Sequence, residues 1–455
     1  MRKAVIPATP AKFAAALCII AVLMSSGAMA ATLSDSVSQA MDTHPAIAAK
    51  KATVDAAKSN VREQRSAFFP QLGVNGRIGR VHEDDDTTRV FTGGFATSWL
   101  GEESATLSQP IFTGFSNVNR LRAAKDRQTS AQFDLTGSTN DIALRAARAH
   151  LNLMRTHDLL DIARKYMDAI QGRKDSISLM VKEGAGDHAE LLQAEEILMA
   201  AKTTRLGYEE AFRQAEADYI SAVGASPGRV LEFGPPSWNR LVPLTIEQAV
   251  AQGAAASPQV KAAEALVAAL GKEAAADKGT LVPRLDAEIS GLNRDQHEEL
   301  GGEVRNMQGM LKLSWNFATG GGQFARVDRD LSMRREAAAK RDDARRNVEH
   351  DVRQKYTSMT IIDQQYDLMR AREKAGEEIL ANLTSQFEGG RQSNLQLINA
   401  NARLFEARAS RTDAYYRRLL ARFELLSVMG SLRDAFAPDA AKPVKSAKAG
   451  APAKD

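Results

Sequence analysis

Residues 107–115 read Leu-Ser-Gln-Pro-Ile-Phe-Thr-Gly-Phe, and residues 313–321 read Leu-Ser-Trp-Asn-Phe-Ala-Thr-Gly-Gly. The Leu-Ser and Thr-Gly pairs of the first stretch therefore return after a shift of 206 residues. The same shift aligns further landmarks without an insertion, namely Gly184 with Gly390 and Gly224 with Gly430. Recurrence at a fixed spacing indicates that the chain contains two copies of one structural unit.

The repeat divides the chain into two halves, residues 31–225 and 244–432. A linker of residues 226–243 joins them and contains four prolines, Pro227, Pro235, Pro236 and Pro243. Residues 433–455 are rich in Ala, Lys and Pro, which predicts a disordered tail.

The first thirty residues have the pattern of a secretory signal peptide. Arg2, Lys3 and Lys12 form a basic start, an apolar run covers residues 13–24, and Ala28-Met29-Ala30 is a small-x-small cleavage site. We expect cleavage after Ala30 and export of the mature chain. The single cysteine, Cys18, lies inside the signal, so the mature chain has no disulfide and no lipid-acceptor cysteine.

The charge balance argues against a nucleic-acid-binding protein. The formal net charge of +4 falls to +1 once the three basic residues of the signal are removed. Four lysines of the tail, Lys442, Lys445, Lys448 and Lys454, carry further positive charge. Basic residues are therefore concentrated at the two ends of the chain and form no binding face.

Each half contains a long stretch without proline that predicts a helical hairpin. The hairpins are expected over residues 117–224 and 323–430. The first arm, residues 117–182, would span roughly 100 Å as a continuous helix, a length that is typical of coiled coils. The returning arms share a heptad pattern, Leu191, Ala194, Leu198, Ala201 and Arg205 in the first half and Leu397, Ala400, Leu404, Ala407 and Arg411 in the second.

Four segments alternate between apolar and polar residues as transmembrane strands do, with lipid on one side and water on the other. They are residues 71–81, 103–113, 285–293 and 303–317. The last is the clearest, because Met307, Leu311 and Leu313 alternate with polar residues.

Four strands cannot close a membrane barrel, because the smallest barrels have about eight. An open edge in lipid would leave backbone groups without hydrogen bonds. Copies of the chain must therefore pool their strands, eight in a dimer or twelve in a trimer. The periodicity does not choose between the two.

The order of these motifs resembles the TolC family of outer-membrane channel proteins. The matching motifs are Phe-Phe-Pro-Gln-Leu at residues 68–72, the stretch at 107–115, and Lys-Glu-Gly-Ala-Gly-Asp-His-Ala-Glu-Leu-Leu-Gln-Ala at 182–194. The last looks like the periplasmic turn of the family's type I secretion branch. The resemblance implies an α+β, mainly α fold in which antiparallel coiled-coil helices form a tunnel. It also implies a homotrimer, with four strands from each protomer in one 12-stranded barrel.

The resemblance further implies a location in the outer membrane, in contact with its lipid, with the helical tunnel in the periplasm. A periplasmic adaptor protein and an inner-membrane ABC or other transporter are the implied partners. Type I secretion of an adhesin-like or toxin-like protein is the leading function, and small-molecule efflux is the alternative. A soluble periplasmic coiled-coil adaptor is a more remote alternative, which requires that the alternating strands do not face lipid.

The sequence gives no reason to expect an enzyme. No nucleophile with a base and an orienting group can be assembled, and the seven histidines form no metal-binding pattern. A phosphate-binding Gly-Lys-Ser/Thr loop is also missing, so energy would come from the partners and no cofactor is expected.

The family closes its periplasmic end near the turns of the long hairpins, and some members place aspartates there. Those two aspartate positions fall on Gln396 and Asn399, so a carboxylate ring of that kind is not expected. Glu190 is the first-half equivalent of Gln396 and could supply one carboxylate. The full set of aperture candidates is Glu190, Asp187, Phe387, Gln392, Gln396 and Asn399.

Arg205 and Arg411 occupy equivalent heptad positions in the two halves. They could pair with acidic residues of neighbouring helices and act as a latch. The alternative is an ordinary solvent-exposed ion pair on a coil surface. For Glu190, Gln396 and Asn399 the alternative is a solvated side chain on the coil surface.

Overall fold

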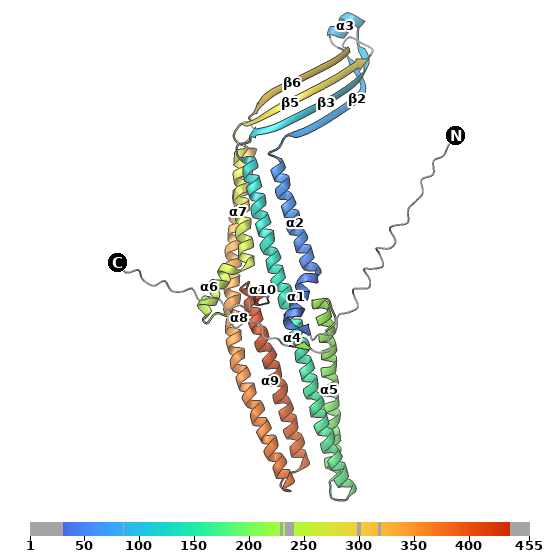
Figure 1. Cartoon of the computed structure of the whole chain (residues 1–455), viewed down its shortest axis with the longest axis vertical. Coiled ribbons are helices and arrows are strands. Elements are labelled where there is room, and N and C mark those ends of the chain that lie inside the picture. Colours follow the sequence, from blue (N-terminus) through green and yellow to red (C-terminus); the bar gives the residue numbers. More distant parts are fainter. Residues whose placement is uncertain are drawn as a thin grey trace, which may run out of the picture.

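The computed structural model describes residues 31–84, 86–227, 231–232, 241–297, 302–316 and 320–436. The predicted cleavage site at Ala30, most of the linker and the tail beyond Phe436 lie outside the described residues. The molecule is elongated, with one β-sheet at one end and long helices running away from it (Figure 1).

Two long helical hairpins make up most of the length. The first consists of α4 (Ser116–Lys182) and α5 (His188–Val223), and the second of α8 (Gly322–Glu388) and α9 (Asn394–Val428). At 1.5 Å per residue, the 67 residues of α4 or α8 extend about 100 Å. Among the described residues, no helix is both long and apolar enough to be a membrane span.

Glycines close the two hairpins in the same way. Gly184 and Gly390 have φ of +74° and +68°, a left-handed conformation that glycine adopts without steric cost. The residue after each glycine donates a backbone hydrogen bond of 2.9 Å to a carbonyl of the preceding helix, so each first arm ends in a Schellman-type turn.

Shorter helices precede each hairpin and also repeat. They are α1 (Leu33–Thr43) and α2 (Pro45–Ser66) in the first half, and α6 (Ile246–Ala256) and α7 (Pro258–Gly279) in the second. Pro45 and Pro258 occupy the first turn of α2 and α7, where a missing N–H costs nothing. Helix α10 (Leu432–Ala435) follows α9. Two-residue strands β1 (Ala31–Thr32) and β4 (Leu231–Glu232) pair in parallel.

The sheet has four antiparallel strands in the order β2-β3-β5-β6. These are β2 (Gln71–Glu83), β3 (Ala96–Phe112), β5 (Arg284–His297) and β6 (Gly302–Ser314). Leu72, Val74 and Ile78 alternate along β2 with side chains 68%, 73% and 83% exposed. Met307, Leu311 and Leu313 alternate along β6 in the same way, and their side chains are also exposed. One face of the sheet is therefore apolar and solvent-exposed in a single copy, as a lipid-facing surface requires.

The structure differs from the sequence expectations at several boundaries. Strands β2 and β5 continue to Glu83 and His297, beyond the expected ends at residues 81 and 293. The strand expected over 103–113 begins at Ala96, since pairing with β2 continues where the apolar alternation fades. The connection between β2 and β3 is correspondingly shorter than the expected strands imply and contains α3 (Asp86–Thr92). The strand expected over 303–317 ends at Ser314, opposite Arg284. The tail, expected to be disordered from residue 433, is ordered to Phe436, which is buried against Phe423.

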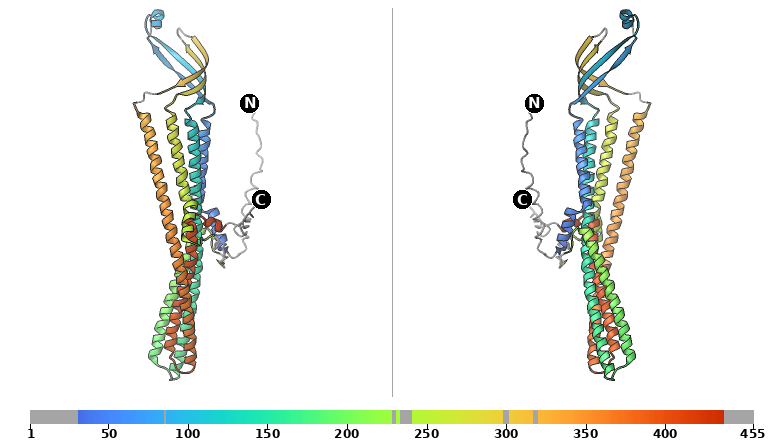
Figure 2. Two further views of the ribbon diagram at one scale, coloured as in Figure 1. Left: turned by 90° about the vertical axis from the view of Figure 1, so that its left-hand side faces the viewer. Right: turned by 90° about the vertical axis from the view of Figure 1, so that its right-hand side faces the viewer.

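The main hydrophobic core lies part of the way along the long helices, where α1 packs against α4 and α5. We call this region the waist. Ser36 of α1 ties this region together, because its Oγ lies 2.9 Å from His150 Nδ1 and 2.8 Å from Tyr219 Oη. Helices α1 and α10 sit on one side of the layer formed by the long helices (Figure 2).

A carboxylate at the waist gives the protein a pH-dependent stability. Glu424 accepts hydrogen bonds from Arg148 and Lys355 at 2.8 Å. Burial alone would raise the pKa of Glu424, but the bonds and charges of Lys355 and Arg148 outweigh it and hold the pKa below its ordinary range. Because the folded-state pKa is lowered, the stabilisation is complete above the ordinary pKa and is lost as the pH falls through the folded value.

We therefore expect Glu424→Gln to lower the free energy of unfolding by about 1 kcal/mol at pH 7, a figure that allows for solvent screening of a half-buried pair. The difference from the parent should shrink as the pH falls below the ordinary pKa of a glutamate, in thermal unfolding measured across pH. Asp218 is the first-half equivalent and is solvent-exposed, so Asp218→Asn is the matched control. An equal loss in both variants, or a loss that persists in acid, would contradict this account.

Candidate functional site

The tips of the two hairpins lie together at the end of the molecule opposite the sheet (Figure 1). Asp187 caps α5, because its Oδ1 accepts a hydrogen bond of 2.8 Å from the Ala189 backbone N–H. Ser393 caps α9 through the backbone N–H of Gln396. Asn394 is 3% exposed and lies against Met180 of the other hairpin, with its Nδ2 3.7 Å from the sulfur.

Glu190 joins the two hairpins directly. Its Oε1 accepts a hydrogen bond of 3.2 Å from the backbone N–H of Leu395, in the first turn of α9. A carboxylate at this position satisfies an N–H that the helix leaves free and also lies at the positive end of the helix dipole. Glu190 is thus placed to hold the tips of the two hairpins against each other.

The other aperture candidates lie around the turn of the second hairpin. Phe387 carries the guanidinium of Arg173 at 5.5 Å from its ring centroid, which is a second contact between the hairpins. Gln392 donates a hydrogen bond of 2.9 Å to Gln386 and stays within its own turn. The side chains of Gln396 and Asn399 are exposed. A role for these residues in an aperture stays a prediction.

The two latch candidates behave differently. Arg411 of α9 binds both carboxylate oxygens of Glu373 of α8, at 2.7 and 3.2 Å. The hydrogen bond to Glu373 raises the pKa of Arg411, so the pair stays charged. Arg205 pairs at 2.8 Å with Glu209 on its own helix, one turn further on. The cross-helix pairing considered for Arg205 is therefore not formed within the described chain.

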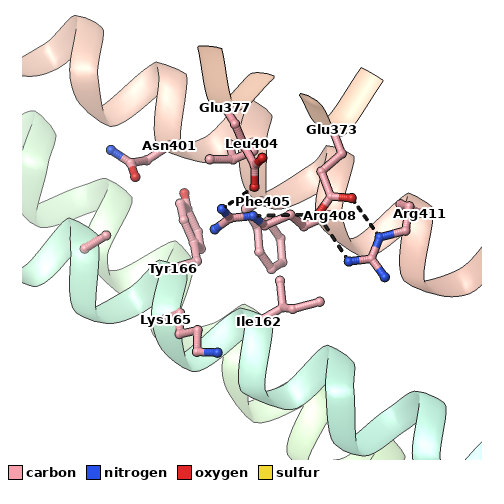
Figure 3. A pocket seen from close by; sticks show the side chains of 11 residues that line it. Ile162, Lys165, Tyr166, Glu373, Glu377, Asn401, Leu404, Phe405, Arg408 and Arg411 are labelled. Atoms are coloured by element: carbon pink, nitrogen blue, oxygen red, sulfur yellow. Dashed lines mark hydrogen bonds and ion pairs between the residues drawn. The ribbon is translucent and has the colours of Figure 1, made fainter. Parts of the chain in front are cut away.

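A pocket of about 430 Å³ lies beside Arg411, between α4, α8 and α9 (Figure 3). Tyr166 stacks on Phe405 with ring centroids 4.6 Å apart, and Arg408 binds Glu377 at 2.7 Å. Figure 3 shows Arg408 and Arg411 side by side, facing the two glutamates of α8. Ion pairs of this kind fix the spacing of the two arms of the second hairpin.

Sequence reasoning did not identify Asn394, Tyr166 or the Arg408–Glu377 pair. Asn394 is the second-half equivalent of His188, so the repeat could have marked the position as equivalent to a turn residue. Charged residues are too frequent along the coils for any one cross-helix pair to stand out in the sequence.

Removing the carboxylate at Glu190 should loosen the tips. Glu190→Ala leaves the Leu395 N–H without its acceptor, and a hydrogen bond to a charged group contributes about 1.5 kcal/mol. Removing about 1.5 kcal/mol of stabilisation from the closed tips corresponds to an about tenfold larger fraction of molecules with open tips. Single-channel conductance in planar lipid bilayers measures this directly.

Glu196→Ala is the control for that variant, because Glu196 is exposed on the same helix and forms no ion pair with a described residue. Conductance of Glu190→Ala equal to that of Glu196→Ala and the parent would exclude Glu190 from holding the tips together.

These contacts are structural in kind. Within the parts of the chain that the structure describes, no group of three or more His, Cys, Asp or Glu residues could hold a metal ion. The tips instead combine helix caps with contacts between the hairpins, from Glu190 to Leu395, from Asn394 to Met180 and from Arg173 to Phe387.

Comparison with known proteins identifies the architecture. A family model described as outer membrane efflux protein matches residues 36–225 and 250–431. The relative named outer membrane efflux protein BepC, from Brucella suis, is 22% identical over 417 residues, which is 90% of this chain and 88% of BepC. A relative from Escherichia coli K12, the cation efflux system protein CusC, is 24% identical over 187 residues, 41% of this chain and 40% of CusC.

Solved structures share the fold across most of the molecule. A crystal structure of CusC gives a TM-score of 0.74 at 15% identity, with 87% of this chain and 91% of that chain covered. The Campylobacter jejuni outer membrane channel CmeC gives a TM-score of 0.73 at 13% identity, with 88% and 86% covered. The predicted fold class is confirmed: a mainly helical chain of the channel-tunnel type with a small membrane sheet.

Proposed function

The chain belongs to the outer membrane efflux protein family, and we propose that three copies of it form the exit duct of a tripartite export system. It is a channel protein of the outer membrane with a helical tunnel in the periplasm, and it is not an enzyme. One observation carries the proposal. A four-stranded sheet with an exposed apolar face stands at the end of helical hairpins about 100 Å long.

The open edges of that sheet support a shared barrel. Strands β2 and β6 each have one neighbour, so a row of backbone N–H and C=O groups on each is left for another copy. In lipid those groups must be paired, and pairing β6 of one copy with β2 of the next achieves this. Three copies give the twelve strands that the resemblance to the TolC family implies.

The proposed partners follow from the shape. A duct of this length would carry cargo across the periplasm when an adaptor protein joins its tips to an inner-membrane transporter, of the ABC or another class. The transporter would supply the energy, since the chain has no phosphate-binding loop of the Gly-Lys-Ser/Thr type.

We place protein cargo first, as in type I secretion. The turn at residues 182–194 supports this choice through its likeness to the type I branch of the family. Small-molecule efflux is the second candidate, and the relatives named efflux proteins favour it.

Deleting the gene and restoring it on a plasmid tests both candidates. Loss of one or a few secreted proteins with unchanged drug susceptibility supports type I secretion. Higher drug susceptibility with an unchanged set of secreted proteins supports efflux and would overturn our first choice. If the deletion alters neither the secreted proteins nor the drug susceptibility, that result would argue against an export duct.

A further inference from the structure

A pocket of about 490 Å³ lies at the waist between α4, α5 and α9, and four arginines line it. Arg145, Arg148 and Arg155 come from α4, and Arg417 comes from α9. We call it the arginine pocket. Its remaining lining is largely apolar, with Ala149, Leu151, Ala222, Leu420 and the ring of Tyr416.

The arginine pocket carries positive charge that the protein does not neutralise. Arg148 binds Glu424 at 2.8 Å and Arg155 binds Asp413 at 2.7 Å. Arg145 and Arg417 are exposed and form no ion pair with any residue that the structure describes. The only acidic residue of the lining is Asp218. Two guanidinium groups therefore remain available beside an apolar surface.

The pocket faces away from α1. His150 of α4 points to α1, since its Nδ1 lies 2.9 Å from Ser36 Oγ. Arg148 and Asn152 are each two residues from His150, about 200° around the helix, and so lie on the opposite side. Helices α1 and α10 lie together on one side of the long helices (Figure 2), where they would obstruct a duct if that side faced inwards. In the proposed trimer, the arginine pocket therefore lines the tunnel.

The internal repeat shows that the coil packing does not require these arginines. The residues 206 positions after Arg145, Arg148, Asn152 and Arg155 are Asp351, Gln354, Ser358 and Ile361. The residue 206 positions before Arg417 is Ala211. The second half thus forms an equivalent hairpin without the cluster, and a trimer would have three arginine pockets rather than six.

We propose that the arginine pocket binds amphipathic anions in transit, meaning a carboxylate, sulfonate or phosphate carried on an apolar body. This inference rests on the proposed duct and narrows its cargo. A guanidinium fork matches the geometry of an oxyanion, and the apolar lining accepts the body of the ligand. The positive charge acts over about 8 Å at physiological salt, so it repels a cationic cargo that passes close to the wall.

Binding of 1-anilinonaphthalene-8-sulfonate to the purified trimer in nanodiscs of zwitterionic lipid tests the site by isothermal titration calorimetry, with empty nanodiscs as the blank. We expect three saturable sites per trimer and at least a tenfold weaker affinity in the double variant Arg145→Gln/Arg417→Gln. Arg353→Gln, at an exposed arginine of α8, is the matched control and should bind as the parent does. Equal binding in the double variant, or equal binding of the uncharged N-phenyl-1-naphthylamine, would overturn the proposal.

The same preparations separate failure of the pocket from failure of the duct. Conductance in planar bilayers reports the duct, so unchanged probe binding in the double variant with normal conductance overturns only the arginine pocket. An absence of conductance in the parent would overturn the proposed function itself.

Cells that carry the double variant identify the source of the anion. Higher sensitivity to cholate, with unchanged sensitivity to the cation ethidium, supports small amphipathic anions as cargo. Lower secretion of acidic proteins with unchanged cholate sensitivity supports acidic polypeptide segments. If neither changes, the arginine pocket has no role in transit.

Discussion

Replacing Gly114 with alanine is expected to abolish assembly of the protein in the outer membrane. Gly114 lies between β3 and α4 with φ of +61°, and a Cβ there would come within 2.1 Å of the Gly279 carbonyl oxygen and 2.3 Å of Val282 Cγ2. The Val282 contact is with a side-chain methyl group, but the contact with Gly279 is with backbone and cannot be relieved without moving the end of α7. We expect a loss of more than about 4 kcal/mol, the range reached only by severe steric or packing defects.

Gly320→Ala is the matched control for Gly114→Ala. Gly320 is the second-half equivalent of Gly114 and has the same φ of +61°, but an added Cβ there meets no atom within 4 Å. It should therefore suffer only the strain of a left-handed alanine, about 1 kcal/mol. The yield of heat-modifiable oligomer in outer-membrane fractions measures both variants. Similar yields would show that the close approach of Gly114 to Gly279 does not matter.

Side-chain hydrogen bonds join the sheet to the helices around Gly114. Gln109 and Asn117 donate hydrogen bonds of 3.1 Å to carbonyls at the end of α2, at Phe68 and Ala67. Trp315 donates one of 3.1 Å to Leu281, just beyond α7. Displacing α7 would break this last contact and shift β5, which begins five residues after the helix ends.

Phe423→Ala is expected to have the second largest effect. Phe423 is fully buried at the waist and packs on Phe436 with ring centroids 5.6 Å apart. Truncation of a buried phenylalanine costs about 3–5 kcal/mol, because the cavity is filled only in part. The loss should appear as a marked drop in the thermal midpoint of the purified oligomer.

Phe405→Ala provides the comparison on the same helix. Phe405 is half-buried and stacks on Tyr166 near the tips, so its loss should cost about 1 kcal/mol for the aromatic contact. A drop in midpoint for Phe405→Ala as large as for Phe423→Ala would contradict the waist as the main core.

Much of the architecture could be predicted from sequence because it depends on periodicity. The 206-residue shift, the absence of proline between Pro110 and Pro227, and the alternation along β6 are local or repeated signals. Asp187, which follows a glycine turn and precedes a heptad pattern, caps α5 in the structure.

Contacts between distant segments could not be predicted in this way. The Glu190–Leu395 bond joins residues 205 positions apart, and the Arg155–Asp413 pair joins residues 258 apart. The arginine pocket depends on which faces of α4, α5 and α9 meet, which no single helix pattern specifies. The ordered residues 433–436 were missed because composition was averaged over the tail and hid the buried Phe436.

Disulfide cross-linking between the edge strands tests the central claim most directly. The only native cysteine is Cys18, within the predicted signal, so Asn75→Cys in β2 can be combined in turn with Asn306→Cys or Gln308→Cys in β6. Oxidation of outer membranes should then give covalent dimers and trimers, with the ladder ending at the trimer because a closed barrel has no free edge. A ladder that stops at the dimer, or extends beyond the trimer, would contradict a barrel of three copies.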